Sequence, residues 1–172
     1  MRLPMKVTVV AIALSLISGG STIYAAPQPK AIVIGQPNSP VEIIGYTARF
    51  QRRSTYTTEG IEHSVEYKSR GTQKVVAIRF GLVSFDVFNR FLGKTGGISM
   101  DDLIPAKTQK SEWVSSPYAD FSFLTGLAYV DLVRLEDGTI WQADEATVLD
   151  EIRKIEKDFD AKLLKEKEGP VR

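Results

Sequence analysis

The sequence predicts an all-β protein, an antiparallel β-sandwich that is followed by one amphipathic α-helix. Several short runs alternate apolar and polar residues with the two-residue period of a β-strand. The dipeptide Asp137-Gly138 separates two of these runs, and an Asp-Gly pair favours the tight turn of a β-hairpin. After Asp144 the apolar spacing changes to three and four residues, the period of a helix. With 172 residues, 43% of them hydrophobic, the chain can bury one core of ordinary size.

The segment Val75–Asn89 is predicted to be the central strand, because it is the longest β-rich run after the N-terminal segment. Its apolar residues lie at even-numbered positions up to Leu82 and at odd-numbered positions from Val83 onward. We expect a β-bulge at Gly81 to cause this change, since glycine accepts the backbone angles of a bulge. The alternative is a strand that is buried on both faces.

The other predicted strands follow the same alternation. They are Ala31–Ile34 as a short edge strand, Val41–Phe50, Ile61–Lys68, Lys107–Val114, Leu127–Leu135 and Gly138–Gln142. The glycine-containing segment Arg90–Gly97 is predicted to be a flexible loop. His63 shares the parity of Ile61, which places it on the buried side, and Trp113 and Trp141 are expected to pack inward.

The N-terminal residues predict export. Arg2 and Lys6 precede the apolar run Val7–Ile17, and a cleavage site after Ala25 fits the small residues that follow. An uncleaved membrane anchor is the competing interpretation. We expect a signal peptide (1–25), a proline-containing spacer (26–40), a β-sandwich domain (41–143), a C-terminal helix (144–168) and a tail (169–172). The protein would be exported through the inner membrane and be periplasmic or secreted, with no stable membrane span after cleavage.

The C-terminal helix is predicted to run from about Glu145 to Lys167, with Asp144 as its N-cap. Its apolar residues form one stripe: Val148, Ile152, Ile155, Phe159 and Leu163. Such a stripe needs a partner surface. It either docks on the sandwich or mediates self-association with a second chain.

Composition and motifs argue against most enzyme classes. The chain has no cysteine and His63 is its one histidine, which excludes thiolate chemistry and histidine-based metal sites. Nucleophile-elbow, phosphate-loop and dinucleotide motifs are missing from the sequence. A hydrolase would have to use Asp86, Asp101 or Asp102, and Asp86 is expected to be a turn or edge carboxylate. We therefore expect no catalytic site, no metal and no cofactor.

The overall charge argues against a nucleic-acid partner. Removing the leader takes two of the 22 basic residues and none of the 21 acidic ones, so the remaining chain is almost neutral. A near-neutral domain lacks the field that steers proteins toward nucleic acid.

A possible binding site combines an aromatic loop with two arginines. The candidate residues are Arg52, Arg53, Tyr118, Phe121 and Phe123. The alternative is that Phe121 and Phe123 cover one end of the core and bind nothing.

The segment FDVFN at Phe85–Asn89 carries a family resemblance. Together with the glycine-containing loop, the Pro-Ala-Lys segment and the late hairpin, it resembles FxLYD-type and related immunoglobulin-like β-sandwich domains of exported bacterial proteins. Valine stands where the motif has leucine, and Phe88 and Asn89 replace its tyrosine and aspartate. The resemblance implies an immunoglobulin-like fold and an adhesion, scaffold or envelope module without catalytic residues.

We therefore expect a non-enzymatic exported module that mediates protein–protein contacts in the bacterial envelope or outside the cell. Its partner would be another envelope or extracellular protein, or a second copy through the C-terminal helix. The alternative is a domain that binds a small ligand or a glycan or lipid polymer, and the third possibility is a carboxylate-dependent hydrolase.

Overall fold

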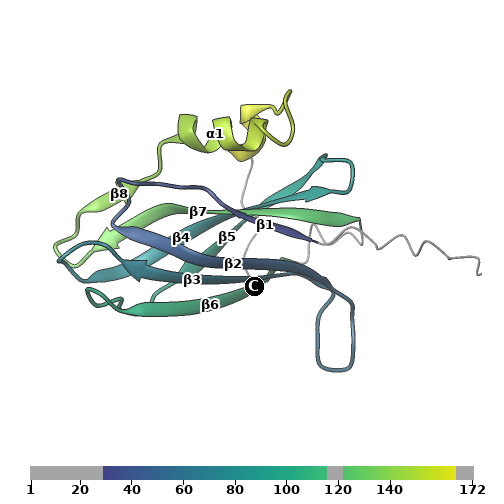
Figure 1. The fold of residues 1–172 in the computed structure, drawn as a ribbon. Helices are drawn as coiled ribbons and strands as arrows, with labels where there is room; N and C mark the ends of the chain where they lie inside the picture. The colour runs from purple at the N-terminus through teal and green to yellow at the C-terminus, as the bar shows by residue number, and fades with distance from the viewer. Residues whose placement is uncertain (1–28, 116–121, 166–172) are drawn as a thin grey trace, which may run out of the picture.

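The computed structural model describes residues 29–115 and 122–165, which form two β-sheets packed face to face (Figure 1). The larger sheet has the order β1-β7-β4-β5, with β8 also paired to β7: β1 is Lys30–Val33, β4 Val75–Asp86, β5 Phe91–Ser99, β7 Phe123–Leu135 and β8 Ile140–Gln142. The smaller sheet has the order β2-β3-β6: β2 is Val41–Gln51, β3 Gly60–Ser69 and β6 Thr108–Ser115. Every pair is antiparallel except β1 with β7, which is parallel. The predicted mostly-β, two-sheet architecture is confirmed.

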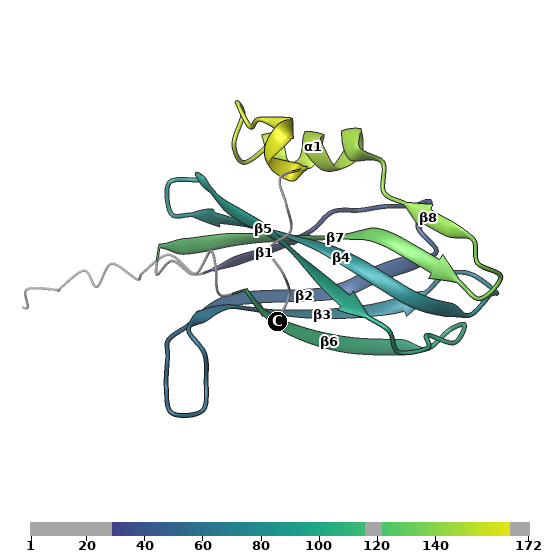
Figure 2. The same cartoon turned by 180° about the vertical axis from the view of Figure 1, so that it is seen from behind.

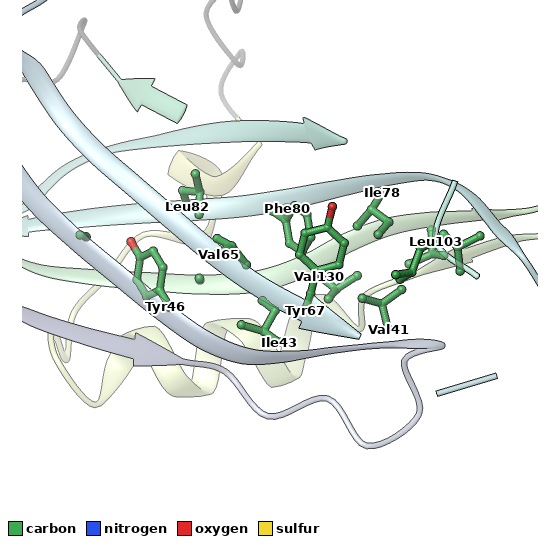
Figure 3. Packing of buried hydrophobic residues seen from close by; sticks show 14 of the residues in the cluster. Val41, Ile43, Tyr46, Val65, Tyr67, Ile78, Phe80, Leu82, Leu103 and Val130 are labelled. Carbon is green, nitrogen blue, oxygen red and sulfur yellow. The ribbon is translucent and has the colours of Figure 1, made fainter. Parts of the chain in front are cut away.

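The first hydrophobic core lies between the two sheets (Figure 3). Phe80 on β4 is fully buried at its centre, with its ring centroid 4.9 Å from that of Tyr67 and 5.5 Å from that of Trp113. The two rings belong to the opposite sheet, so these aromatic contacts bind one layer to the other. The predicted inward packing of Trp113 and the burial of His63 are confirmed.

The central strand β4 is buried on both faces, and the predicted bulge at Gly81 is wrong. Gly81 pairs in regular register with both neighbouring strands. Leu82 faces the core between the sheets, whereas Val83 belongs to a second core beneath the C-terminal segment. A side chain at position 81 would place its Cβ 2.1 Å from Cζ of Tyr129, so glycine is required by this close approach.

The segment Arg90–Gly97 is predicted to be a flexible loop, but from Phe91 onward it forms most of strand β5 (Phe91–Ser99). Its glycines accommodate large neighbours, because a Cβ at Gly97 would lie 2.7 Å from the ring of Trp113. The loss of strand propensity at glycine is offset here by aromatic packing across the sandwich.

The C-terminal segment crosses the outer face of the larger sheet and forms a third layer (Figures 1 and 2). Helix α1 spans Glu145–Arg153, and the Asp144 side chain caps it by accepting from the backbone N–H groups of Ala146 and Thr147. The predicted continuous helix is wrong, because α1 stops at Arg153 and the chain turns before it forms a 3₁₀ turn at Ala161–Leu164; Lys167, the predicted end, lies outside the described residues.

The apolar stripe docks on the sheet although the helix is short. Val148 and Ile152 are buried on α1, and Phe159, beyond the end of the helix, is buried as well. The ring of Phe159 packs edge-to-face on Phe91 of β5, with centroids 5.2 Å apart. Of the two partners predicted for the stripe, the chain's own sandwich is the one observed.

The outer edge of β7 is closed by three different elements. β1 pairs with its first half, β8 pairs near its end, and the side chain of Gln36 lies between them. The Gln36 amide donates to the carbonyl of Val130 (2.8 Å) and accepts from its N–H (2.7 Å), which imitates the backbone of a neighbouring strand. The end of the predicted spacer is therefore part of the sheet. Within residues 29–115 and 122–165, no helix is long and apolar enough to cross a membrane.

Candidate functional site

The outer face of the larger sheet is covered by α1 and the following turns at one end and is open at the other. We call the open part the apolar–basic face and define it by two cross-strand rows of side chains: Ile98, Arg79, Leu132 and Gln142 in the first, and Ala77, Arg134 and Ile140 in the second. Ile98 is 52% exposed and Ile140 is 64% exposed. The solvated face of an antiparallel sheet is normally polar, so this concentration of apolar side chains is unusual.

A β-bulge in β7 shapes the middle of this face. Val130 pairs with Phe80, and Leu132 pairs with Arg79, so Asp131 is an extra residue in β7. Its carboxylate is buried, with Oδ2 2.7 Å from Nε of Arg79. The two atoms form an ion pair, although the N–H is not aimed at the oxygen and the contact lacks hydrogen-bond geometry. The pair holds the Arg79 guanidinium against the sheet, at the boundary between the open and the covered halves.

A cavity of about 230 Å³ lies at this boundary, between the sheet and the C-terminal segment. Its charged lining residues come from β4, β5, β7, the start of α1 and the 3₁₀ turn: Arg79, Lys94, Asp131, Glu145 and Lys165. Lys94 Nζ donates to the backbone carbonyl of Leu164 (3.2 Å) and lies 6.0 Å from the ring centroid of Tyr129. Lys165 Nζ lies 3.4 Å from Oε2 of Glu145. The lining is thus densely charged, and its cations are held in place by neighbouring groups.

A second polar feature is a chain of hydrogen bonds through the buried His63. Tyr46 Oη is 2.9 Å from Nδ1 of His63, Nε2 is 3.0 Å from Oγ of Ser115, and this hydroxyl lies 3.3 Å from the carbonyl oxygen of Ile61. Because a carbonyl can only accept, Ser115 donates to Ile61, Nε2–H donates to Ser115, and Tyr46 donates to Nδ1. Burial lowers the pKa of His63 to about 4 and raises the pKa of Tyr46, so both groups are neutral at pH 7.

This arrangement differs from that of a nucleophilic serine. The Ser115 hydroxyl hydrogen points to a backbone carbonyl, and the imidazole donates to Oγ where a general base would accept from it. Both side chains are also almost fully buried. The chain of hydrogen bonds satisfies the polar groups of a core histidine, as buried polar groups require.

The structure describes three of the five sequence-predicted binding residues. Arg52 and Arg53 are exposed in the loop between β2 and β3, which projects beyond the sheets in Figure 1. Phe123 is only 5% exposed and packs in the core between the sheets, so its predicted role at an exposed lip is wrong. Tyr118 and Phe121 lie outside the described residues.

The candidate carboxylates for a hydrolase lie at opposite ends of β4. Asp86 is its last residue and accepts from the N–H groups of Phe88 and Arg90, both at 2.8 Å, as the predicted turn carboxylate. Asp102 lies at the other end of β4, because the next residue, Leu103, forms a β-bridge with Val75, the first residue of that strand. Oδ2 of Asp102 accepts a hydrogen bond from Lys74 Nζ at 2.9 Å. A strand of 12 residues spans roughly 35 Å, so Asp86 cannot pair with Asp101 or Asp102.

Sequence reasoning did not identify the apolar–basic face or the cavity. One signal was present, since Arg79 and Asp131 each interrupt a strongly apolar strand sequence. Isolated opposite charges in two buried strands indicate an ion pair when those strands are neighbours. Ile98 carried no such signal, because it followed a segment that was predicted to be a loop.

Comparisons with known proteins address the fold alone. No family model matches the chain, and no curated protein matches it. The fold is similar to the crystal structure of a hypothetical protein from Peptoclostridium difficile 630, with a TM-score of 0.50 and 8% sequence identity over 70% of this chain and 93% of that chain. A Northeast Structural Genomics Consortium target gives a TM-score of 0.42 and 12% identity over 60% of this chain and 80% of that chain.

Proposed function

We propose that this chain is a non-enzymatic, exported immunoglobulin-like β-sandwich module that binds another protein of the envelope or the extracellular space through its apolar–basic face. The observation that carries this proposal is the exposure of Ile98 and Ile140 on a sheet face whose other half is covered by the chain's own C-terminal segment. Exposed apolar side chains that gather on one face are typical of protein interaction sites.

The strand order supports the immunoglobulin-like assignment. Strands β2, β3 and β6 form one sheet, in that spatial order. The β4–β5 hairpin, β7 and β8 contribute to the other, in the spatial order β8-β7-β4-β5. Immunoglobulin domains likewise place strands A, B and E, with D, in one sheet and strands C, F and G in the other.

The charge of the face defines the chemistry of the partner. Arg134 is exposed in the second row, between the half-buried Ala77 and the exposed Ile140, whereas Arg79 in the first row is paired with the Asp131 carboxylate. A complementary surface would carry apolar side chains with carboxylates beside them, since complementary charge steers association and fixes its register. The proposed partner is therefore a protein with an acidic, apolar patch.

The geometry of the polar groups supports a non-catalytic role. The one histidine is buried and donates to Ser115, and Asp86 is separated from Asp101 and Asp102 by the length of a strand. The binding face contains neither group.

Site-specific photo-cross-linking in the cells that produce the protein tests the proposal. The photoreactive amino acid benzoylphenylalanine would replace Ile98 or Ile140, and in the matched control it would replace Val114, which is 44% exposed on the smaller sheet. We expect one discrete adduct with another protein from positions 98 and 140 and none from position 114. Adding Arg134→Glu should reduce adduct formation several-fold, because it places a carboxylate against an acidic partner.

Three results would overturn the proposal. Equal adducts from position 114 would show that the face has no special role. An adduct of twice the protein's mass would identify a second copy as the occupant. Absence of any adduct at both test positions, in protein that is produced and folded normally, would mean that the face is uncovered in the cell.

A further inference from the structure

We infer that the loop between β2 and β3 is a cleavage site for an endoprotease that recognises paired basic residues, and that the cut protein stays folded as two associated chains. The loop, residues 52–59, joins two strands of the smaller sheet, so the site is separate from the apolar–basic face and independent of the proposed partner. The reaction is hydrolysis of the Arg53–Ser54 peptide bond. Water supplies the hydroxyl group of the new Arg53 carboxyl group and the hydrogen of the new Ser54 amine.

The sequence has two pairs of adjacent basic residues, and the structure makes one of them accessible. The pairs are Arg52-Arg53 and Arg153-Lys154. Every residue from 52 to 59 is exposed, and the loop projects beyond both sheets in each view (Figures 1 and 2). Exposed loops with small and polar residues are the preferred sites of proteolytic nicking.

The loop can open at little cost, which matters because a peptide that a protease cuts is bound as an extended strand. Its turn is held by hydrogen bonds between groups of the loop itself. The N–H of Ser54 donates to the carbonyl of Thr57 (3.1 Å), the N–H of Tyr56 donates to Ser54 Oγ (3.2 Å), and Thr57 Oγ1 donates to the carbonyl of Arg52 (3.1 Å). Water can replace these exposed bonds. Since every side chain of the loop is exposed, opening it removes none from a core.

The second basic pair is protected by its surroundings. Arg153 is the last residue of α1, and the N–H of Lys154 donates to the carbonyl of Glu151 at the end of the helix. The preceding residue, Ile152, is fully buried in the second core. Extending this segment along a protease would unwind the end of the helix and pull Ile152 into water. We therefore expect cleavage here to be at least about tenfold slower than in the loop.

Contacts across the cut would hold the two chains together. In the first chain, β1 pairs with β7 and β2 pairs with β3, and both partner strands belong to the second chain. Val41 and Tyr46 of β2 are buried in the core between the sheets, and Tyr46 Oη lies 2.9 Å from Nδ1 of His63. None of these contacts involves the loop, so the cut should leave the core intact.

Limited proteolysis of the protein, purified from the cells that produce it, tests the inference. A purified endoprotease that cleaves after paired basic residues is added, and the products are followed by intact mass. We expect one early cut, after Arg53, and two fragments that stay together in size-exclusion chromatography and separate in urea. The imidazole resonance of His63 should keep its position, because Tyr46 still contacts the ring. In untreated protein from the same cells, mass spectrometry should detect the fragment that begins at Ser54.

A matched pair of double variants locates the recognised charges. Arg52→Gln/Arg53→Gln changes two exposed side chains and should slow cleavage in the loop at least about a hundredfold, since a protease pocket built for a cation rejects a neutral side chain. Arg153→Gln/Lys154→Gln removes the other basic pair and should leave the rate in the loop unchanged.

Four outcomes would overturn the inference. Cleavage after Lys154 before cleavage after Arg53 would show that the end of the helix opens more readily than the loop. Fragments that separate without denaturant would show that the strand pairing does not hold the cut protein together. Cleavage of Arg52→Gln/Arg53→Gln at the original rate would show that the basic pair is not recognised. Absence of the Ser54 fragment from cells would mean that the loop is not a natural cleavage site.

Discussion

Protonation of the buried His63 should make the protein less stable in mild acid. Desolvation lowers the pKa of this imidazole to about 4 in the folded protein, whereas an unfolded chain would have the ordinary value of 6.5. Between these values the unfolded state binds a proton that the folded state does not bind. The free energy of unfolding therefore falls as the pH falls from about 6.5 to about 4.

The size of this loss follows from the two pKa values. A difference of about 2.5 units, at 1.36 kcal/mol per unit, gives about 3 kcal/mol. For a small domain this is a large fraction of the total stability of about 5–15 kcal/mol. The contribution of His63 is fully present above pH 6.5, is lost across the window, and changes little below pH 4.

Urea denaturation of the protein and of His63→Gln at several pH values measures the effect. Glutamine can accept from Tyr46 and donate to Ser115, and it does not titrate. Carboxylates with lowered pKa values, such as Glu42 beside Arg70, also contribute stability that is lost at lower pH. This loss occurs in both proteins, so it cancels when the two free energies of unfolding are subtracted. We expect the stability difference between the two proteins to change by about 3 kcal/mol between pH 7.5 and pH 4.

Two results would refute the reasoning. A difference that stays constant with pH, or that changes in the opposite direction, would mean that the folded imidazole is not held neutral. Because His63 is the one histidine in the chain, its imidazole resonance can be followed directly by NMR. A resonance that titrates near pH 6.5 in the folded protein would show that the ring is solvated.

Three further predictions address the packing of the larger sheet. Gly81→Ala should destabilise the protein by about 1–3 kcal/mol, because the new Cβ would overlap the ring of Tyr129. In calorimetry, the double variant Gly81→Ala/Tyr129→Ala should lose less stability than the sum of the two single variants. Phe159→Ala should cost about 3–5 kcal/mol in chemical denaturation if the C-terminal segment is part of the folded unit, and a cost below about 1 kcal/mol would contradict its docking. Gln36→Ala leaves the N–H and the carbonyl of Val130 without their amide partner, so it should lower the free energy of unfolding by about 1–3 kcal/mol and speed amide exchange at Val130. Unchanged exchange at Val130 would show that water replaces the side chain fully.

The elements that could be predicted from the sequence are those whose local signals agree with their tertiary surroundings. The Asp137-Gly138 hairpin forms because Gly138 has the positive φ of 88° that its turn requires, and the strongly apolar strand β7 precedes it. The N-cap at Asp144 is equally local, since it depends on a side chain and two nearby N–H groups.

The errors occurred where contacts with another layer of the fold decide the outcome. The change of parity in β4 suggested a bulge, because nothing in the strand itself shows that α1 will cover its other face. The glycines of β5 have low strand propensity, and their role becomes clear only when Trp113 from the opposite sheet lies against Gly97. The end of α1 depends on the contact between Phe159 and Phe91, two residues far apart in the chain.

The same physical reason explains why the candidate site could not be predicted. Among the described residues, the apolar–basic face is left open because α1 and the 3₁₀ turn pack on the other half of the sheet, and that position is a property of the packed structure. The cavity depends on the same segment, because its walls come from strands and turns that are distant in sequence.

Hydroxyl-radical footprinting in intact cells and on the purified protein most directly tests whether a partner covers the open half of the larger sheet. The account predicts that Ile98 and Ile140 are oxidised in the purified protein and protected in cells, while Val114 is oxidised to the same extent in both. Equal oxidation of Ile98 and Ile140 in the two samples would contradict it.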